Sequence, residues 1–271
     1  MTLGLQITLT GHELVLNPYF ASLLPAMSLA AMELGYSFLF VPPNPSREAF
    51  VDPLLAGGRI DAGIVVDPLD GDPFVSALTA GAKPFASIGR LSDPAHRNWV
   101  DNDHGAAAAN VLQHLADRGY EKPHLLTIPT KVSYVSDYST AFSRGTSGGP
   151  RSIVVAEDLS EQSAFEVVKR ELESPRPPDA IFCIHDQLAI GALRAAAELG
   201  VAVPDELGVV GVTDSLVAAH ARPPLTSVRV FPEQAGRAVV ELIDQLLREG
   251  EVSAPRIIPT RLVARASTAR T

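Results

Sequence analysis

Short apolar runs recur along the chain, and segments long enough to form helices separate them. Each run consists mostly of Val, Ile, Leu, Phe and Ala without a regular alternation of polar positions, which is typical of strands buried on both faces of a parallel sheet. The runs cover residues 3–9, 37–41, 62–66, 85–89, 125–128, 153–156, 180–184 and 208–212. This pattern predicts an α/β fold in which parallel strands alternate with helices.

The predicted helices have recognisable ends. Asn17-Pro18 combines a capping side chain with proline at the first helical position, and Gly35 can supply a left-handed stop, so a helix is predicted between them. Pro25 lies inside this helix and is expected to kink it. The same signals predict three further helices, over residues 103–119, from residue 160 and from residue 186.

The length and hydrophobic content indicate a globular protein with a substantial core. With 271 residues and 46% hydrophobic positions, the chain should form about two domains. We expect the change of domain near Asp101, after one complete set of four strand-helix units. The Gly- and Ser-rich segment 143–152 is expected to be a mobile loop.

The charge balance argues against a surface that binds nucleic acid. The chain has 22 Lys and Arg against 31 Asp and Glu, a formal net charge of -9, which would repel phosphate backbones. The first basic residue is Arg47, so the basic start of a secretory signal is missing, and Asn17, Pro25 and Glu33 interrupt the apolar stretch 14–41. These features predict a soluble, cytoplasmic chain without a membrane partner.

The sequence carries no common signature of an enzyme or of a cofactor site. Neither Gly-x-Gly-x-x-Gly nor Gly-x-x-x-x-Gly-Lys occurs, there is no Gly-x-Ser-x-Gly turn, and the histidines show no metal-binding spacing. The single cysteine, Cys183, lies in an apolar run that favours an inert thiol. Carboxylate pairs such as Asp67/Asp70 could act as acid and base, but side chains at strand ends more often cap helices or bind a ligand. We therefore expect no enzyme activity, no cofactor and no metal.

Five short motifs are spread along the chain in a fixed order. The longest, 179–228, runs from a strand through His185-Asp186, a helix closed by Gly200, a Val-Pro-Asp-Glu turn and a Gly-Val-Thr-Asp strand end to Pro-Pro-Leu-Thr-Ser-Val. The others are Asn-Pro-Tyr-Phe at 17–20, Arg-Ile-Asp-Ala-Gly-Ile at 59–64, Val-Asp-Asn-Asp-His-Gly-Ala at 100–106 and Leu-Val-Ala-Arg-Ala-Ser at 262–267. Each motif is weak alone, but their order is specific, and together they resemble the motifs of one protein family, the LacI/GalR-type transcription regulators.

The resemblance implies two Rossmann-like parallel-sheet lobes of the periplasmic-binding-protein-like type I, joined by three crossovers around a ligand cleft. The N-terminal, dimerising lobe would comprise residues 1–100 and 231–252, and the C-terminal lobe residues 101–230 and 253–271. The first helix, Tyr19 to Leu34, would take part in dimerisation. In open sheets of this kind, ligands bind at the carboxyl ends of the strands.

The implied function is that of an effector-sensing and dimerisation core of a LacI-type regulator, acting as a repressor-like homodimer. A small-molecule effector would control the binding of operator DNA by a helix-turn-helix headpiece, which is expected to lie outside this chain. The alternative is a solute-binding receptor of a transport system, which shares the two-lobed fold. An α/β enzyme ranks third because no catalytic motif is present.

The resemblance assigns effector contacts in the first lobe to Tyr19, Phe20 and Arg90. Tyr19 and Phe20 match aromatic positions that stack on the effector, although they could equally pack into the core beneath the first helix. Arg90 matches the arginine of an Asp-Arg pair, but Gly89 replaces the aspartate.

Candidate contacts in the second lobe are Tyr134, Tyr138, His185, Thr213 and Asp214. Tyr138 stands where the family has an effector-clamping arginine, and Tyr134 lies one turn earlier. His185 replaces an asparagine and could be a donor to the ligand or a pH-sensitive contact, whereas Asp186 could cap the following helix. Thr213 replaces the first aspartate of an Asp-Asp pair, and Asp214 keeps the second.

These replacements all remove groups that a sugar-binding site would use. A sugar site pairs its buried carboxylates, amides and guanidinium groups with vicinal hydroxyls, because an unpaired buried polar group costs about 1–3 kcal/mol. Four of the expected groups are changed here, at Gly89, Tyr138, His185 and Thr213. We therefore expect that the effector is not a simple hexose, or that aromatic stacking holds it.

Overall fold

The computed structural model describes residues 1–8, 17–43, 45–145, 152–251 and 254–270, which divide into two compact units. Unit 1 comprises Met1–Asn102 and Phe231–Ile258, and unit 2 comprises Asp103–Val230 and Pro259–Thr271. The chain thus passes between the units three times. The last passage follows Ile258 rather than residue 252, because residues 256–258 still pair with a strand of unit 1.

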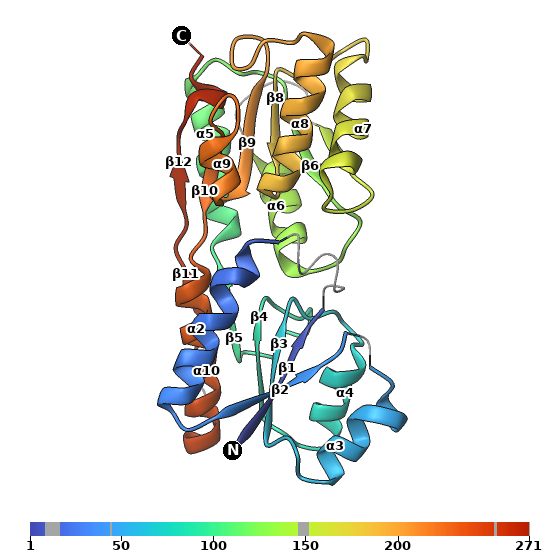
Figure 1. Ribbon diagram of the computed structural model, residues 1–271, viewed down its shortest axis with the longest axis vertical. Coiled ribbons are helices and arrows are strands. Elements are labelled where there is room, and N and C mark those ends of the chain that lie inside the picture. The colour runs from blue at the N-terminus through green and yellow to red at the C-terminus, as the bar shows by residue number, and fades with distance from the viewer. Residues whose placement is uncertain (9–16, 44, 146–151, 252–253, 271) are drawn as a thin grey trace. The chain divides into compact units, whose positions relative to one another are not determined.

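Unit 1 is a six-stranded parallel sheet in the order β11-β5-β4-β3-β1-β2. Its strands are β1 (Thr2–Ile7), β2 (Ser37–Val41), β3 (Ala62–Val66), β4 (Phe85–Ile88), β5 (Trp99–Asn102) and β11 (Arg256–Ile258). The long helices α2 (Tyr19–Glu33) and α10 (Pro232–Glu249) lie side by side (Figure 1) and bury one apolar cluster against the sheet. A second cluster, on the opposite face, packs under the short helices η1 (Arg47–Val51), α3 (Asp52–Ala56) and α4 (Pro73–Ala80).

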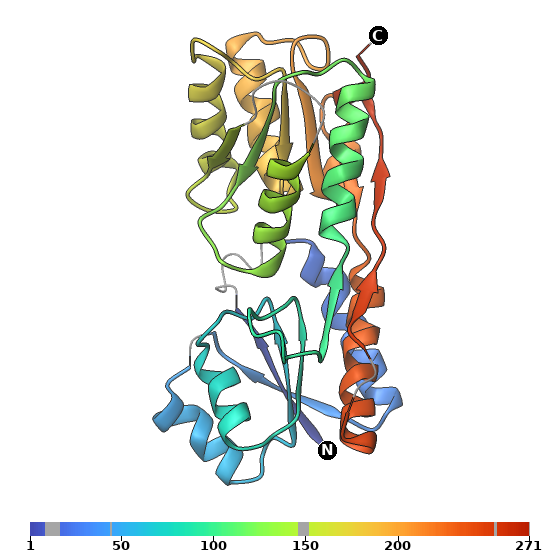
Figure 2. The same cartoon turned by 180° about the vertical axis from the view of Figure 1, so that it is seen from behind.

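Unit 2 contains a second six-stranded sheet, in the order β12-β10-β9-β8-β6-β7. The strands are β6 (Pro123–Thr127), β7 (Ser152–Val155), β8 (Ala180–Cys183), β9 (Gly208–Thr213), β10 (Thr226–Arg229) and β12 (Arg261–Val263), and only β12 runs antiparallel to its neighbour. The helices are α5 (His104–Asp117), α6 (Ser133–Arg144), α7 (Glu161–Leu172), α8 (Asp186–Leu199) and α9 (Leu216–His220), followed by the 3-10 turn η2 (Ala266–Thr268). In Figure 2 the same unit is seen from behind.

The ends of the predicted elements can be compared with the structure. Gly35 has the expected positive φ of 78° after α2, and Pro25 lies inside that helix. The Asn17 side chain accepts a hydrogen bond from the Tyr19 amide at 3.1 Å, but the helix begins at Tyr19, one residue later than predicted. The predicted loop 143–152 falls mostly outside the described residues; α6 continues to Arg144 and β7 begins at Ser152.

Close packing of α8 on α7 shows how small side chains shape unit 2. Gly191 lies where an added Cβ would approach the Glu161 carbonyl oxygen to 2.3 Å, so the two helices can meet at this distance only over a glycine. Four alanines of α8, at positions 189, 192, 195 and 196, are buried as well. This packing fixes α8, and with it the residues at the start of α8, on the sheet of unit 2.

Candidate functional site

The end of β9 is held in an unusual backbone conformation. Thr213 and Asp214, which end and follow the strand, have φ values of 111° and 51°. A positive φ is rare for residues other than glycine, and for a β-branched residue such as threonine it is a true outlier that costs about 1–3 kcal/mol. Such strain persists only where neighbouring groups hold it, and here it lies at the carboxyl edge of the sheet.

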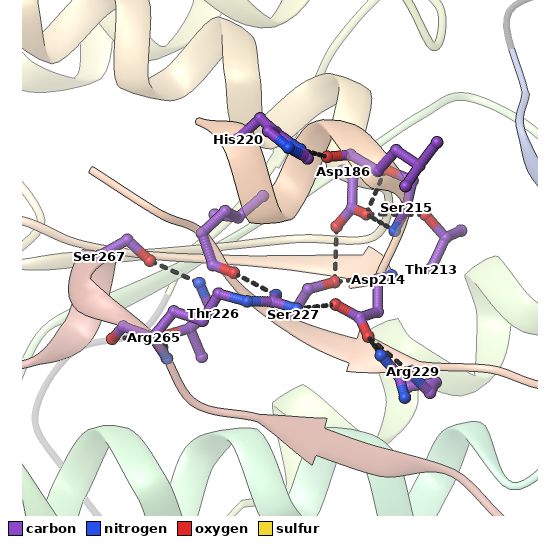
Figure 3. A network of polar contacts seen from close by, with 12 residues as sticks. Asp186, Thr213, Asp214, Ser215, His220, Thr226, Ser227, Arg229, Arg265 and Ser267 are labelled. Carbon is purple, nitrogen blue, oxygen red and sulfur yellow. Dashed lines mark hydrogen bonds and ion pairs between the residues drawn. The ribbon is translucent and has the colours of Figure 1, made fainter. Parts of the chain in front are cut away.

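The carboxylate of Asp186 provides that restraint (Figure 3). Its Oδ2 accepts hydrogen bonds from the Thr213 hydroxyl at 2.9 Å and from the Ser215 amide and hydroxyl at 2.7 and 2.8 Å. Its Oδ1 accepts one from the Ser227 hydroxyl at 2.6 Å. The start of α8 is thereby tied to the end of β9 and to β10.

Burial and hydrogen bonding shift the pKa of Asp186 in opposite directions. Desolvation raises the pKa of this carboxyl, while the hydrogen bonds from Ser227, Ser215 and Thr213 lower it. Gly211 makes room for the group, since a Cβ there would lie 2.3 Å from Asp186 Oδ1. Asp186 is therefore an internal anchor whose acceptor positions are occupied by the protein itself.

Asp214 is saturated in the same way. Its Oδ2 accepts from Arg229 Nε and its Oδ1 from Arg265 Nη2, both at 2.5 Å, and its side chain is fully buried. Arg229 is the last residue of β10, and Arg265 lies after β12 and also donates to the Leu225 carbonyl oxygen at 2.7 Å. The carboxylate thus connects three segments of unit 2, and both of its buried oxygens are engaged by arginines.

His185 caps α8, a role that the sequence had suggested for Asp186. The His185 Nδ1 accepts a hydrogen bond from the Gln187 amide at 3.2 Å, so the ring proton is on Nε2. The side chain is only 5% exposed, and this burial lowers the pKa of His185 from 6.5 to about 4. The ring is therefore neutral near pH 7, with its proton on Nε2.

The two tyrosines of α6 differ in their surroundings. Tyr138 is fully buried, with its ring edge-on to Phe182 at 5.5 Å and to His104 at 5.0 Å between centroids. Tyr134 is half-buried, and its ring lies 6.0 Å from that of His104. The packing of Tyr138 is that of a core residue, so Tyr134 is the better placed of the two to contact a ligand.

The two aromatic residues of unit 1, Tyr19 and Phe20, also differ in how deeply they are buried. Phe20 is 2% exposed and belongs to the core beneath α2. Tyr19 is half-buried and forms an edge-to-face contact with Phe20 at 5.7 Å. Burial first, and then the negative charges of Asp67 and Asp101, raise the pKa of Tyr19 far above its ordinary value, so its hydroxyl stays protonated.

Arg90 is directed toward other residues of unit 1. Its guanidinium lies 5.3 Å from the centre of the Trp99 ring and 3.5 Å from Asp101 Oδ2. No group of three or more His, Cys, Asp or Glu side chains that could hold a metal ion occurs in the described part of the chain. Within the same residues, no helix is long and apolar enough to span a bilayer.

The sequence indicated Thr213 and Asp214 but not the groups that hold them. Ser215, Ser227 and Arg265 came to attention only as parts of motifs that resemble the family, and Arg229 lies one residue beyond the motif 179–228. Their one local signal is that polar residues follow apolar strands, which many surface residues share. Their role depends on contacts between distant segments.

Residues 112–268 match the family described as the periplasmic binding protein-like domain. The chain is 26% identical to the transcriptional regulator CelR of Thermobifida fusca, over 98% of this chain and 81% of CelR. It is also 26% identical to the regulator AscG of Escherichia coli, over 98% of this chain and 80% of AscG.

Solved structures give the same fold. A CelR-cellobiose complex superimposes with a TM-score of 0.89 at 22% identity, covering 98% of this chain and 84% of that one. The lac repressor dimer bound to operator and an anti-inducer has a TM-score of 0.84 at 24% identity, covering 99% and 81%. The fold is thus that of the periplasmic-binding-protein type I cores.

Because the family match covers more than half of its residues, the chain belongs to the periplasmic binding protein-like domain family, and it is the effector-binding core of a LacI-type transcription regulator. The relatives named above are regulators, not enzymes or transport receptors.

Replacing Asp214 with Asn should destabilise unit 2, because two arginines would lose their buried anionic partner. We expect the free energy of unfolding in urea to fall by about 3 kcal/mol. This is at the low end of the cost of breaking a buried ion pair, because the Arg229 side chain is 40% exposed. The exposed Asp205→Asn variant is the control and should change stability by less than about 0.5 kcal/mol. Equal stability of the two variants would contradict this role of Asp214.

His185 should make stability depend on pH. Since its folded-state pKa of about 4 lies below the ordinary 6.5, the unfolded chain binds the proton more readily, and stability falls as the pH drops from 6.5 toward 4, by up to about 3 kcal/mol. His185→Asn keeps a capping side chain and should flatten this part of the profile, measured by urea unfolding across the pH range. Burial of His96 and His114 also lowers their pKa values and leaves a residual slope.

The exposed His220→Asn variant is the matched control and should retain the full slope. A His185→Asn profile as steep as that of the parent protein would show that His185 is not buried as a neutral ring.

Proposed function

We propose that the effector binds at the carboxyl ends of the parallel strands of unit 2, where His185, Thr213 and Tyr134 provide contacts. The main support is the saturation of both carboxylates at the edge of unit 2. Every hydrogen bond to Asp186 and Asp214 given above comes from the protein. Other polar groups at this edge are the hydroxyl oxygens of Thr213 and Ser215, and the neutral imidazole of His185 and the Tyr134 ring lie beside them in unit 2.

Such a set of groups selects against simple sugars. A hexose or pentose is normally recognised by carboxylates that accept hydrogen bonds from two neighbouring hydroxyls, and leaving those hydroxyls unpaired would cost about 1–3 kcal/mol each. CelR has been solved with cellobiose, and a related regulator from Enterococcus faecium with ribose. For this chain we propose an effector that is not a simple monosaccharide, or one whose main contact is stacking on an aromatic ring.

Effector binding is proposed to control DNA binding by shifting the equilibrium between two conformations of the core. The size of this shift is limited by the difference between the affinities of the effector for the two conformations. The contact with operator DNA is assigned to a helix-turn-helix segment of the regulator and not to these residues. The net charge of -9 supports this assignment, because DNA binding requires a positive surface.

The homodimer is proposed to use the exposed side of α2 together with β2. Leu29 and Met32 of α2 are 55% and 67% exposed, and Phe40 of β2 is 61% exposed. Three large apolar side chains on adjacent elements are typical of a protein-protein interface. Helix α2 belongs to the lobe that the sequence assigns to dimerisation.

Tyr134→Ala should weaken effector binding while leaving the fold intact. A thermal-shift screen of monosaccharides, disaccharides, nucleosides, amino acids and small acids identifies the effector, because a ligand at about 100 times its Kd stabilises by about 2.7 kcal/mol. Calorimetry with that compound should then show a Kd raised by about tenfold in Tyr134→Ala, from the loss of ring contacts.

Phe50→Ala, a change of a partly exposed ring in η1, is the control and should bind like the parent protein. Tight calorimetric binding of glucose or ribose, or an unchanged Kd for Tyr134→Ala, would contradict the proposed recognition.

The double variant Leu29→Glu/Met32→Glu should dissociate the dimer, because it places four carboxylates at the contact between two copies. Sedimentation velocity should show monomers at micromolar concentration. Val155→Glu, at an equally exposed position of unit 2, is the control and should remain dimeric. A dimeric double variant would show that α2 lies outside the interface.

A further inference from the structure

Unit 1 contains a pocket of about 370 Å³ beneath the loop that joins β4 to β5. Leu91, Pro94, Pro255 and the Trp99 ring provide its apolar walls, and Arg90, Asp93, His96 and Arg97 provide its polar groups. A volume of this order is within the usual range for small-molecule sites. None of the roles assigned above to the carboxyl edge of unit 2 uses these residues.

The pocket lies on the face of the sheet away from α2 and α10. Ile88 and Val100, which pair with each other, belong to the core under those two helices. Because side chains alternate along a strand, the paired residues Ser87 and Trp99 point to the other face. The pocket is therefore separate from the core of α2 and α10.

One wall combines an indole ring with a cation. The Arg90 guanidinium lies 5.3 Å from the centre of the Trp99 ring. The same guanidinium forms an ion pair with Asp101, at 3.5 Å between Nη1 and Oδ2. These contacts hold the indole in a fixed position, half-buried at the start of β5. A planar or apolar ligand group can pack against such a ring.

The hydrogen bonds of His96 define what that side chain offers to a ligand. The single hydroxyl proton of Ser87 is donated to the Gly89 carbonyl oxygen at 2.7 Å, so the Ser87 oxygen accepts from His96 Nε2 at 3.1 Å. The imidazole is stacked on Phe85, with 4.6 Å between ring centres and an angle of 8°. Its Nδ1 is consequently a hydrogen-bond acceptor that has no partner among the described residues.

Arg97 is the cation of this pocket that a carboxylate can reach. It is exposed and forms no ion pair within the described part of the chain, whereas Arg90 is paired with Asp101. Asp93 also lines the pocket, and one of its oxygens accepts a hydrogen bond from the Ala95 amide at 2.8 Å. A ligand carboxylate is therefore expected to pair with Arg97.

We propose that this pocket binds a small organic acid that carries a ring and a hydroxyl group. The carboxylate pairs with Arg97, the ring packs against Trp99 and the apolar walls, and the hydroxyl donates to His96 Nδ1. The site is independent of the effector site proposed at the carboxyl edges, and its occupation can be measured separately.

Trp99 is the only tryptophan of the chain, so its fluorescence reports directly on this pocket. The probe is 4-hydroxyphenylacetate, titrated into the full chain while tryptophan emission is recorded. We expect a saturable change with this acid, a Kd about tenfold higher for phenylacetate, which lacks the hydroxyl, and a similar loss for the neutral 4-hydroxyphenylacetamide.

Arg97→Ala tests the assignment without disturbing the core, because the side chain is exposed. It should raise the Kd of 4-hydroxyphenylacetate by about tenfold, whereas Arg176→Ala, an exposed arginine of unit 2, should leave it unchanged. Unfolding in urea should confirm that both variants are as stable as the parent.

Three results would overturn the proposal: no saturable change in fluorescence, equal binding of the acid and its amide, or an unchanged Kd in Arg97→Ala. Failure of the effector screen would not affect any of these readings, because the probe and the fluorescence signal belong to the pocket of unit 1 alone.

Discussion

The buried carboxylate of Asp186 is the contact on which the edge of unit 2 depends. Located at the first position of α8, it accepts hydrogen bonds from Thr213, Ser215 and Ser227, and so joins α8 to the end of β9 and to β10. The positive φ of Thr213 and Asp214 persists because these bonds hold it. The close packing of α8 on α7 keeps the anchor in position.

This arrangement also decides the chemistry of the edge. Carboxylates that hold the backbone together, as Asp186 does, or that neutralise two arginines, as Asp214 does, cannot also receive the hydroxyls of a sugar. His185 is neutral and uses one ring nitrogen as a helix cap. The proposal is that this core keeps the fold of its relatives and recognises a different kind of effector.

Much of the fold could be predicted from the sequence, because long apolar runs and helix stops are local signals. The strands β5, β10, β11 and β12 escaped that pattern, since they are short and carry polar residues, as in Trp-Val-Asp-Asn. The roles at the site were harder to predict. Whether Asp214 faces a ligand depends on arginines 15 and 51 residues further along the chain, and whether Tyr138 or Tyr134 is buried depends on His104 and Phe182. Such contacts leave no periodic trace in the sequence.

We propose that the effector is recognised at the carboxyl ends of the strands of unit 2 by groups other than carboxylates. Hydrogen-deuterium exchange of the chain, with and without the effector found by screening, is the decisive measurement, because bound ligand slows the exchange of the amides beside it. We expect slower exchange in the segments that contain Tyr134, His185 and Thr213. Protection confined to other parts of the chain, with these three segments unchanged, would contradict the proposal.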